Sequence, residues 1–247
     1  MKNEKNSFSY DEYSEILKEY KGRFGNFKNI NNDEFVILRH DVEFSIERAY
    51  NLAVFEKKYE VKSTFLFQVL SNAYNPFSCI NRLKIEEIKN LGHEVGLHFY
   101  VSHLKPYDYT GLRIELKRQK DLFELALDFP CEIFSFHRPP EWVLELREDH
   151  INGIINTYGP SFFEFSPEPQ KIKYIADSKH KWSYGHPLNY SSQRRIQILL
   201  HPDEWTIKGD CSLEEFFKDL INHKTKIFKS TLLQETKSFL KIRDQLK

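Results

Sequence analysis

The chain has 247 residues, of which 40% are hydrophobic and 15% aromatic, and its 36 Lys and Arg residues balance 36 Asp and Glu residues. This composition is typical of a soluble globular protein and excludes a disordered chain. A net charge of zero argues against a nucleic-acid-binding protein and against polybasic attachment to a membrane. No apolar run approaches the roughly 18 residues of a membrane-spanning helix, so no membrane span is expected.

The N-terminus and the cysteines give an expectation for location. Residues 1–7 are polar and no apolar stretch follows them, so no secretory signal is expected. An odd number of widely spaced cysteines without a CxxC motif predicts free thiols in a reducing compartment. These are Cys79, Cys131 and Cys211. A cytoplasmic protein is therefore expected.

Hydrophobic periodicity predicts alternating helices and strands along the whole chain. Helices are expected at residues 11–20, 45–59, 85–90, 113–127, 213–223 and 230–247. Strands are expected at residues 35–38, 63–70, 94–98, 133–136, 172–176 and 196–200. Ser45 is the expected N-cap of the second helix, and Gly92 marks the end of the third. This order is typical of an α/β protein with a mainly parallel sheet. Residues 1–30 are expected to form an N-terminal helical extension, and residues 31–247 a single domain.

Polar side chains follow five of the predicted strands. They are His40 with Asp41, His98, His137 with Arg138, Asp177, and His201. In α/β sheets and barrels the active site lies at the C-terminal ends of the strands. We therefore expect these side chains, distant in the sequence, to meet in one site.

The residue types at these strand ends are typical of a divalent metal centre. Asp41 and Glu43 share one face of an extended segment, so one carboxylate can bind a metal while the other takes a proton. His98 and His103 are both close enough in sequence to reach one ion. Each residue also has a structural interpretation: a core histidine, a helix N-cap for Asp41, or a first-turn charge for Glu43.

At this point the sequence resembles a known family. Its motifs are similar, in order, to those of the polysaccharide deacetylases of carbohydrate esterase family 4. In particular they resemble a variant group whose first motif begins Arg-His-Asp-Val-Asp. The matching segments are Arg39-His40-Asp41-Val42-Glu43, STFLF around Phe65, Gly92-His93-Glu94-Val95-Gly96-Leu97-His98, Arg138-Pro139-Pro140, Asp177-Ser178 with Trp182, and Leu199-Leu200-His201.

The resemblance implies a distorted (β/α) barrel of about seven parallel strands and a divalent metal, expected to be zinc. It implies Glu43, His98 and His103 as metal ligands. The two histidines are five residues apart where the family usually has four, so His137 is the alternative third ligand. Two further departures are Glu43, where the family has Asp, and the segment Pro140-Glu141-Trp142, which replaces an aromatic-glycine continuation.

The resemblance also implies catalytic roles. Asp41 is the expected general base, His201 the general acid, and Arg138 the residue that orients Asp41. Trp182 and Asp177 are expected to contribute to substrate binding.

The expected function is a metal-dependent hydrolase that removes an acyl group, N-acetyl in the first instance, from an amino sugar or related carbohydrate in surface-polysaccharide biosynthesis. The expected partner is a carbohydrate or nucleotide-sugar substrate. Two alternatives stay open. One is hydrolysis of another small C–N amide bond, such as a formyl amide on a nucleotide-linked sugar. The other is a non-catalytic, carbohydrate-binding descendant of the same fold.

Overall fold

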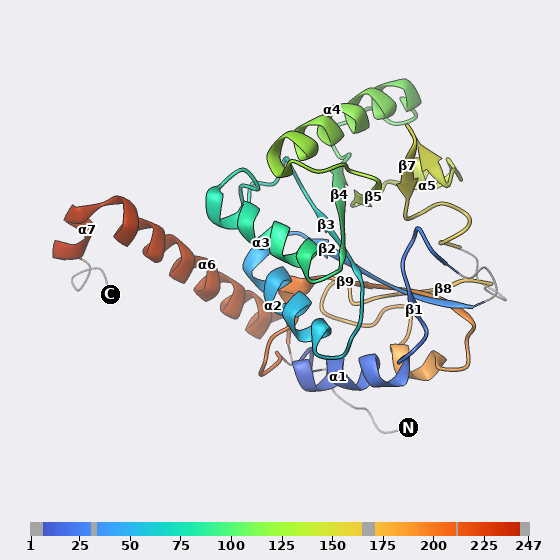
Figure 1. Cartoon of the computed structure of the whole chain (residues 1–247), viewed down its shortest axis with the longest axis horizontal. Helices are drawn as coiled ribbons and strands as arrows, with labels where there is room; N and C mark the ends of the chain where they lie inside the picture. The colour runs from blue at the N-terminus through green and yellow to red at the C-terminus, as the bar shows by residue number, and fades with distance from the viewer. Residues whose placement is uncertain (1–6, 31–33, 165–170, 211, 243–247) are drawn as a thin grey trace.

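Helices surround the outside of one curled sheet in the computed structural model, which describes residues 7–30, 34–164, 171–210 and 212–242 (Figure 1). The strands are β1 Phe24–Gly25, β2 Phe35–Val42, β3 Thr64–Phe67, β4 Glu94–Tyr100, β5 Ile133–His137, β6 His150–Ile151, β7 Ile154–Asn156, β8 Lys173–Ala176 and β9 Arg195–Leu200. The α-helices are α1 Tyr10–Glu19, α2 Ile46–Lys57, α3 Cys79–Asn90, α4 Tyr109–Leu127, α5 Glu141–Leu144, α6 Leu213–Glu235 and α7 Lys237–Ile242. Two 3₁₀ turns, η1 Pro187–Tyr190 and η2 Pro202–Glu204, complete the elements.

The sheet is almost entirely parallel. Its order is β6-β7-β5-β4-β3-β2-β9-β8, with β1 beside the first half of β2. Of the pairs between described strands, only the β6–β7 hairpin is antiparallel, so seven consecutive parallel strands run from β7 to β8. Among the described residues β8 does not pair with β7, which leaves the sheet open on that side. This architecture confirms the predicted distorted (β/α) barrel.

Strand β2 is an interior strand of the sheet, and its alternation decides which residues of the first motif reach the site. It pairs with β3 on one side and β9 on the other, and all eight of its residues are buried. Because side chains alternate along a strand, Arg39 and Asp41 face the inside of the curled sheet. His40 faces outward, where its Nε2 lies 2.6 Å from Glu56 Oε1 of α2.

Capping residues explain which helix starts were predicted correctly and which were predicted several residues too late. Ser45 caps α2, as predicted, by accepting the Arg48 N–H at 3.3 Å. Helix α3 begins at Cys79 instead of 85, because Ser78 caps it. Helix α4 begins at Tyr109 instead of 113, because Asp108 caps it. In α3 the early apolar residues Ile80 and Leu83 are exposed, so apolar periodicity gave no signal there.

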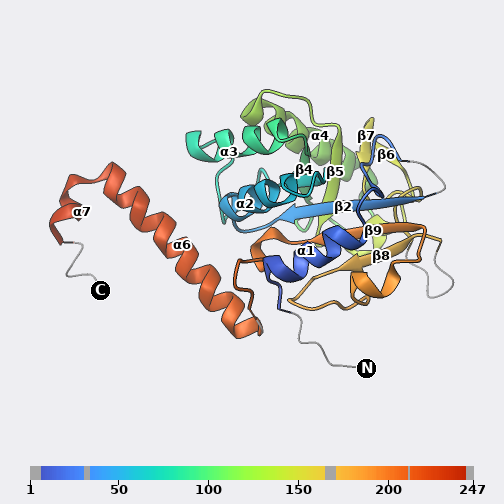
Figure 2. The same ribbon diagram turned by 60° about the horizontal axis from the view of Figure 1, so that its bottom comes forward.

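The two ends of the chain differ in how they pack. Helix α1 packs Tyr13, Ile16 and Leu17 against the sheet in one buried cluster. Helix α6 buries only Phe216 and Leu220 and projects from the body (Figure 2). The predicted division between residues 223 and 230 is wrong, because α6 runs unbroken from Leu213 to Glu235. The second predicted helix, 230–247, is instead divided at Thr236, after which α7 begins.

Some predictions fall on residues that the structure does not describe: the polar N-terminus up to residue 6, the boundary at residue 31, Cys211, and the end of the last helix at 243–247. Cys79 and Cys131 are free thiols. None of the described helices combines the length and the apolar character that crossing a membrane requires. Sequence patterns missed the short elements β1, α5 and the β6–β7 hairpin.

Candidate active site

A cavity of about 660 Å³ opens at the C-terminal ends of the parallel strands. Asp41 and Glu43 line it from the end of β2, His98 from β4, and His201 from the end of β9. Aromatic rings also line the cavity. These are Phe136, Tyr158, Phe163, Tyr174 and Tyr184, called the aromatic wall below. The structure thus brings together most of the polar strand ends.

Three donor atoms converge at one point of this cavity: Glu43 Oε1, His98 Nε2 and His137 Nδ1. The two contacts of His137 Nδ1, to Glu43 Oε1 and to His98 Nε2, are each 3.0 Å long. The third separation, His98 Nε2 to Glu43 Oε1, is 3.7 Å. Tetrahedral zinc with ligands at roughly 2.0–2.1 Å would hold them about 3.3 Å apart. The donor set therefore fits a divalent metal in both chemistry and spacing.

The register of β4 and β5 explains why His98 and His137 meet. His98 lies opposite Ser135 and Tyr100 opposite His137 in the parallel pair. Alternation along β5 turns Ser135 and His137 to the inside, and the ring of Tyr100 stacks on that of His137 with centroids 5.3 Å apart.

His103 is not brought to this cluster. Its side chain is 44% exposed, beyond the end of β4, and its Nε2 lies 3.6 Å from Glu115 Oε1. The chain turns outward after Tyr100, so the histidine that follows in sequence points away from the strand ends. Of the two alternatives for the third ligand, the structure places His137 beside Glu43.

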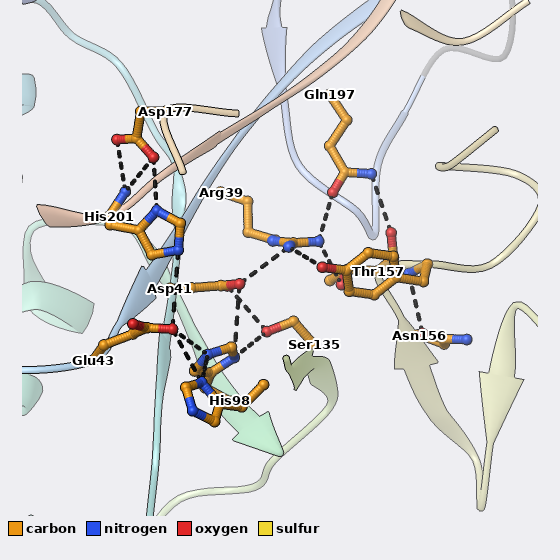
Figure 3. Close-up of polar contacts among 12 residues, drawn as sticks. Arg39, Asp41, Glu43, His98, Ser135, Asn156, Thr157, Asp177, Gln197 and His201 are labelled. Carbon is orange, nitrogen blue, oxygen red and sulfur yellow. Dashed lines mark hydrogen bonds and ion pairs between the residues drawn. The ribbon is translucent and has the colours of Figure 1, made fainter. Parts of the chain in front are cut away.

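Ser135 joins the candidate ligand His98 to Asp41 (Figure 3). Its hydroxyl donates to Asp41 Oδ1 at 3.0 Å, so it accepts from His98 Nδ1 at 2.7 Å. That leaves the lone pair of His98 Nε2 facing Glu43 and His137. Ser135 was not predicted as a site residue. It lies two residues before His137 on a predicted strand, so alternation alone would have placed both side chains on the same face.

Removing the Ser135 hydroxyl is expected to weaken metal binding. Outer hydrogen bonds of this kind orient a ligating histidine, and their loss costs about 10–100-fold in metal affinity. Competition with a chromogenic chelator would measure the affinities of wild type, Ser135→Ala and the hydroxyl-retaining Ser135→Thr. Equal affinity in wild type and Ser135→Ala would show that this hydroxyl does not position His98.

Asp41 is a buried carboxylate held in its charged form. Burial raises its pKa, but the charges of Arg39, His98 and His201 and the Ser135 hydrogen bond outweigh burial, so the pKa is lowered overall. The Arg39 guanidinium donates to Asp41 Oδ2 at 3.0 Å. Arg39 is itself held by Gln197 at 2.8 Å and by Tyr158 at 2.9 Å.

The role expected of Arg138 therefore falls to Arg39. Arg39 lies two residues before Asp41 on the same face of β2, so the strand itself fixes the contact. Arg138 follows the end of β5 with a φ of 49°, and its exposed side chain lines the cavity without a hydrogen bond or ion pair to Asp41.

His201 is held by Asp177 (Figure 3). Asp177 Oδ1 accepts from His201 Nδ1 at 2.7 Å, and Oδ2 accepts the His201 backbone N–H at 2.9 Å. Burial lowers the pKa of His201, but Asp177 raises it to about 10. The imidazolium Nε2 lies 4.0 Å from Glu43 Oε1. Asp177 was expected to bind substrate; it is fully buried and positions His201 instead.

Trp182 lies outside the cavity. It packs between Phe8 and Trp205, and its Nε1 donates to Glu12 at 3.3 Å. The loop after β8 carries it back over α1 instead of across the strand ends. Trp182 was expected to contribute to substrate binding, but the aromatic rings that line the cavity are those of the aromatic wall, which residue spacing did not reveal.

No family model and no curated protein matches the chain. Among solved structures, it is similar to a carbohydrate esterase family 4 pseudoenzyme from Bacillus anthracis, at 16% identity and a TM-score of 0.46 over 79% of this chain and 62% of that one. A family 4 carbohydrate esterase from the same organism matches at 18% identity and a TM-score of 0.43, over 87% and 86% of the two chains. A family 4 acetyl xylan esterase from Clostridium thermocellum, solved with a cobalt ion, matches at 15% identity and a TM-score of 0.39, over 76% and 84%.

The chain spans about three fifths of the length of the pseudoenzyme structure. These solved structures carry the name of the family that the sequence motifs resemble.

Proposed function

We propose that this protein is a metal-dependent hydrolase that removes an acyl group from an amino sugar or related carbohydrate. One observation carries the proposal: the donor atoms of Glu43, His98 and His137 converge beside the charged Asp41 and His201 in a single cavity. Two nitrogen donors and one oxygen donor favour zinc, and leave room for water or substrate. A cytoplasmic location and a role in surface-polysaccharide biosynthesis stay predictions.

The residues of this chain divide the work of amide hydrolysis. A divalent metal held by Glu43, His98 and His137 would polarise a carbonyl and lower the pKa of water to about 7. Asp41, kept ionised by Arg39, takes a proton from the attacking water. His201 donates a proton to the leaving amine from Nε2, since its Nδ1 hydrogen is engaged by Asp177. The aromatic wall offers a face on which a sugar ring packs.

Metal removal and reloading tests this proposal. Purified protein would be stripped with a chelator, reloaded with zinc, and assayed for free amine released from N-acetylglucosamine or its oligomers. About one ion per chain is expected, with amine release lost on stripping and restored on reloading. Bound metal without amine or acyl release from any acylated sugar would favour the non-catalytic binding protein. No metal after loading would overturn the metal site itself.

A further inference from the structure

Two cations that line the cavity have no partner among the residues that the structure describes. Arg138 and Lys179 both line the cavity and are exposed. Neither side chain forms an ion pair or a hydrogen bond with any of the described residues. Arg138, singled out by its motif, is thus left without the role that Arg39 fills.

The carboxylates of the same cavity are, by contrast, all engaged. Their partners are Arg39 for Asp41 at 3.0 Å, His137 for Glu43 at 3.0 Å, the Phe44 backbone N–H for Asp203 at 2.9 Å, and His180 for Glu204 at 3.1 Å. Three of these four carboxylates thus have an arginine or a histidine beside them, and Asp203 accepts backbone N–H groups, whereas Arg138 and Lys179 have no carboxylate partner among the described residues. A ligand that complements this cavity brings negative charge to those two side chains.

Both cations line the same cavity as the aromatic wall. Arg138 follows β5, the neighbour of β7, and Lys179 follows β8, which lies across the open seam from β7. The rings of the wall run Phe136, Tyr158, Phe163, Tyr174 and Tyr184, with successive centroids 6.1, 5.0, 5.0 and 5.5 Å apart. An apolar face for a sugar ring thus shares its cavity with two groups that bind oxyanions.

We propose that the substrate of this site carries a phosphate ester, bound by Arg138 and Lys179 while its acylated amino sugar packs on the aromatic wall. The inference rests on the proposed function and names its substrate class. An arginine fork and a lysine ammonium are typical phosphate ligands. A cavity of about 660 Å³ lies within the range of sites for small molecules, roughly 300–1,000 Å³, and suits a soluble sugar phosphate.

Substrate selectivity tests this inference. The zinc-loaded protein would be assayed with N-acetylglucosamine, its 1-phosphate and its uridine diphosphate ester. We expect kcat/KM to be at least about tenfold higher for a phosphorylated sugar, the effect of one charged hydrogen bond. The phosphorylated sugar with the higher kcat/KM shows whether the natural substrate is a sugar phosphate monoester or a nucleotide diphosphate sugar. Equal kcat/KM for all three sugars would overturn the inference and leave the proposed function intact.

Matched variants assign that selectivity to the two cations. Arg138→Ala and Lys179→Ala are expected to lower the ratio of kcat/KM for phosphorylated over neutral sugar about tenfold each. Arg147 is also exposed and has a φ of 47°, but lies outside the cavity, so Arg147→Ala should keep the ratio. Lys181→Ala is the equivalent control for Lys179. A ratio unchanged in Arg138→Ala and Lys179→Ala would contradict the assignment.

Calorimetry separates this inference from the proposed function. If no sugar is hydrolysed, the proposed function fails. Binding of N-acetylglucosamine 1-phosphate to zinc-loaded wild type, weakened in Arg138→Ala and partly restored in Arg138→Lys, would still support the phosphate site. Stronger binding of a carboxylate sugar such as N-acetylmuramic acid, or no binding of the phosphate, would overturn it.

Discussion

Replacing His137 with alanine is expected to remove stoichiometric metal, whereas replacing His103 leaves the metal in place. His137 supplies one of three converging donor atoms, and its loss leaves only Glu43 and His98. The effect should exceed the roughly 10–100-fold that loss of an outer hydrogen bond costs. Elemental analysis after dialysis against a metal buffer, beside a titration of metal affinity, measures both variants.

His103→Ala is the matched control for this experiment. It deletes the same kind of side chain from an exposed position that lies outside the cluster of donor atoms. His98→Ala should reproduce the loss seen with His137. Metal lost in His103→Ala and kept in His137→Ala would instead favour the paired histidines of the family pattern.

A second large effect is expected from Asp41→Asn, which should lower turnover by about 10²–10⁴-fold while metal content stays near wild type. Asparagine has nearly the shape of aspartate and still accepts the Arg39 hydrogen bond, but it cannot take a proton from water. Steady-state kinetics on the zinc-loaded variant, with its metal content measured in the same sample, would give both quantities.

Asp203→Asn is the control for a change of charge in the same cavity. Asp203 is buried and lines the same cavity, and its carboxylate accepts backbone N–H groups that an asparagine oxygen also accepts. Burial raises the pKa of Asp203 to about 6, so the carboxyl is still mostly ionised at pH 7 and Asp203→Asn removes a charge from the cavity without removing the base. Turnover near wild type in Asp203→Asn is therefore expected. Full activity in Asp41→Asn would remove Asp41 as the base.

Periodicity predicted the parts of this site that lie on strands. The alternation in β2 that put Asp41 and Glu43 on one face also puts Arg39 there and turns His40 toward α2. Alternation was applied to Asp41 and Glu43 when the site was predicted from the sequence, but not to Arg39 and His40. Ser135 and His137 follow the same alternation in β5, so this pattern favours His137 as a ligand over His103.

The parts that failed lie on loops, where the direction of a side chain depends on turns that have no period. His103, Arg138 and Trp182 each follow the end of a strand, and the chain bends differently after each one. The role of Asp177 was missed for another reason. Its contact with His201 needs β8 and β9 to be neighbours, and the pairing of strands was not predicted from the sequence.

The open seam between β7 and β8 gives the cavity one adaptable side. Elsewhere, ladders of backbone hydrogen bonds fix neighbouring strands about 4.8 Å apart, and widening them breaks several bonds at once. Across the seam the contact is made by rings such as Tyr158, Phe163 and Tyr174, which slide without breaking a backbone bond. The side chains proposed to act on the acyl group thus lie on hydrogen-bonded strands, whereas the rings proposed to contact the rest of the substrate lie at the open seam. Proteins built this way could change the size of the molecule they accept by exchanging rings at the seam, while the side chains on β2, β4, β5 and β9 stay in place.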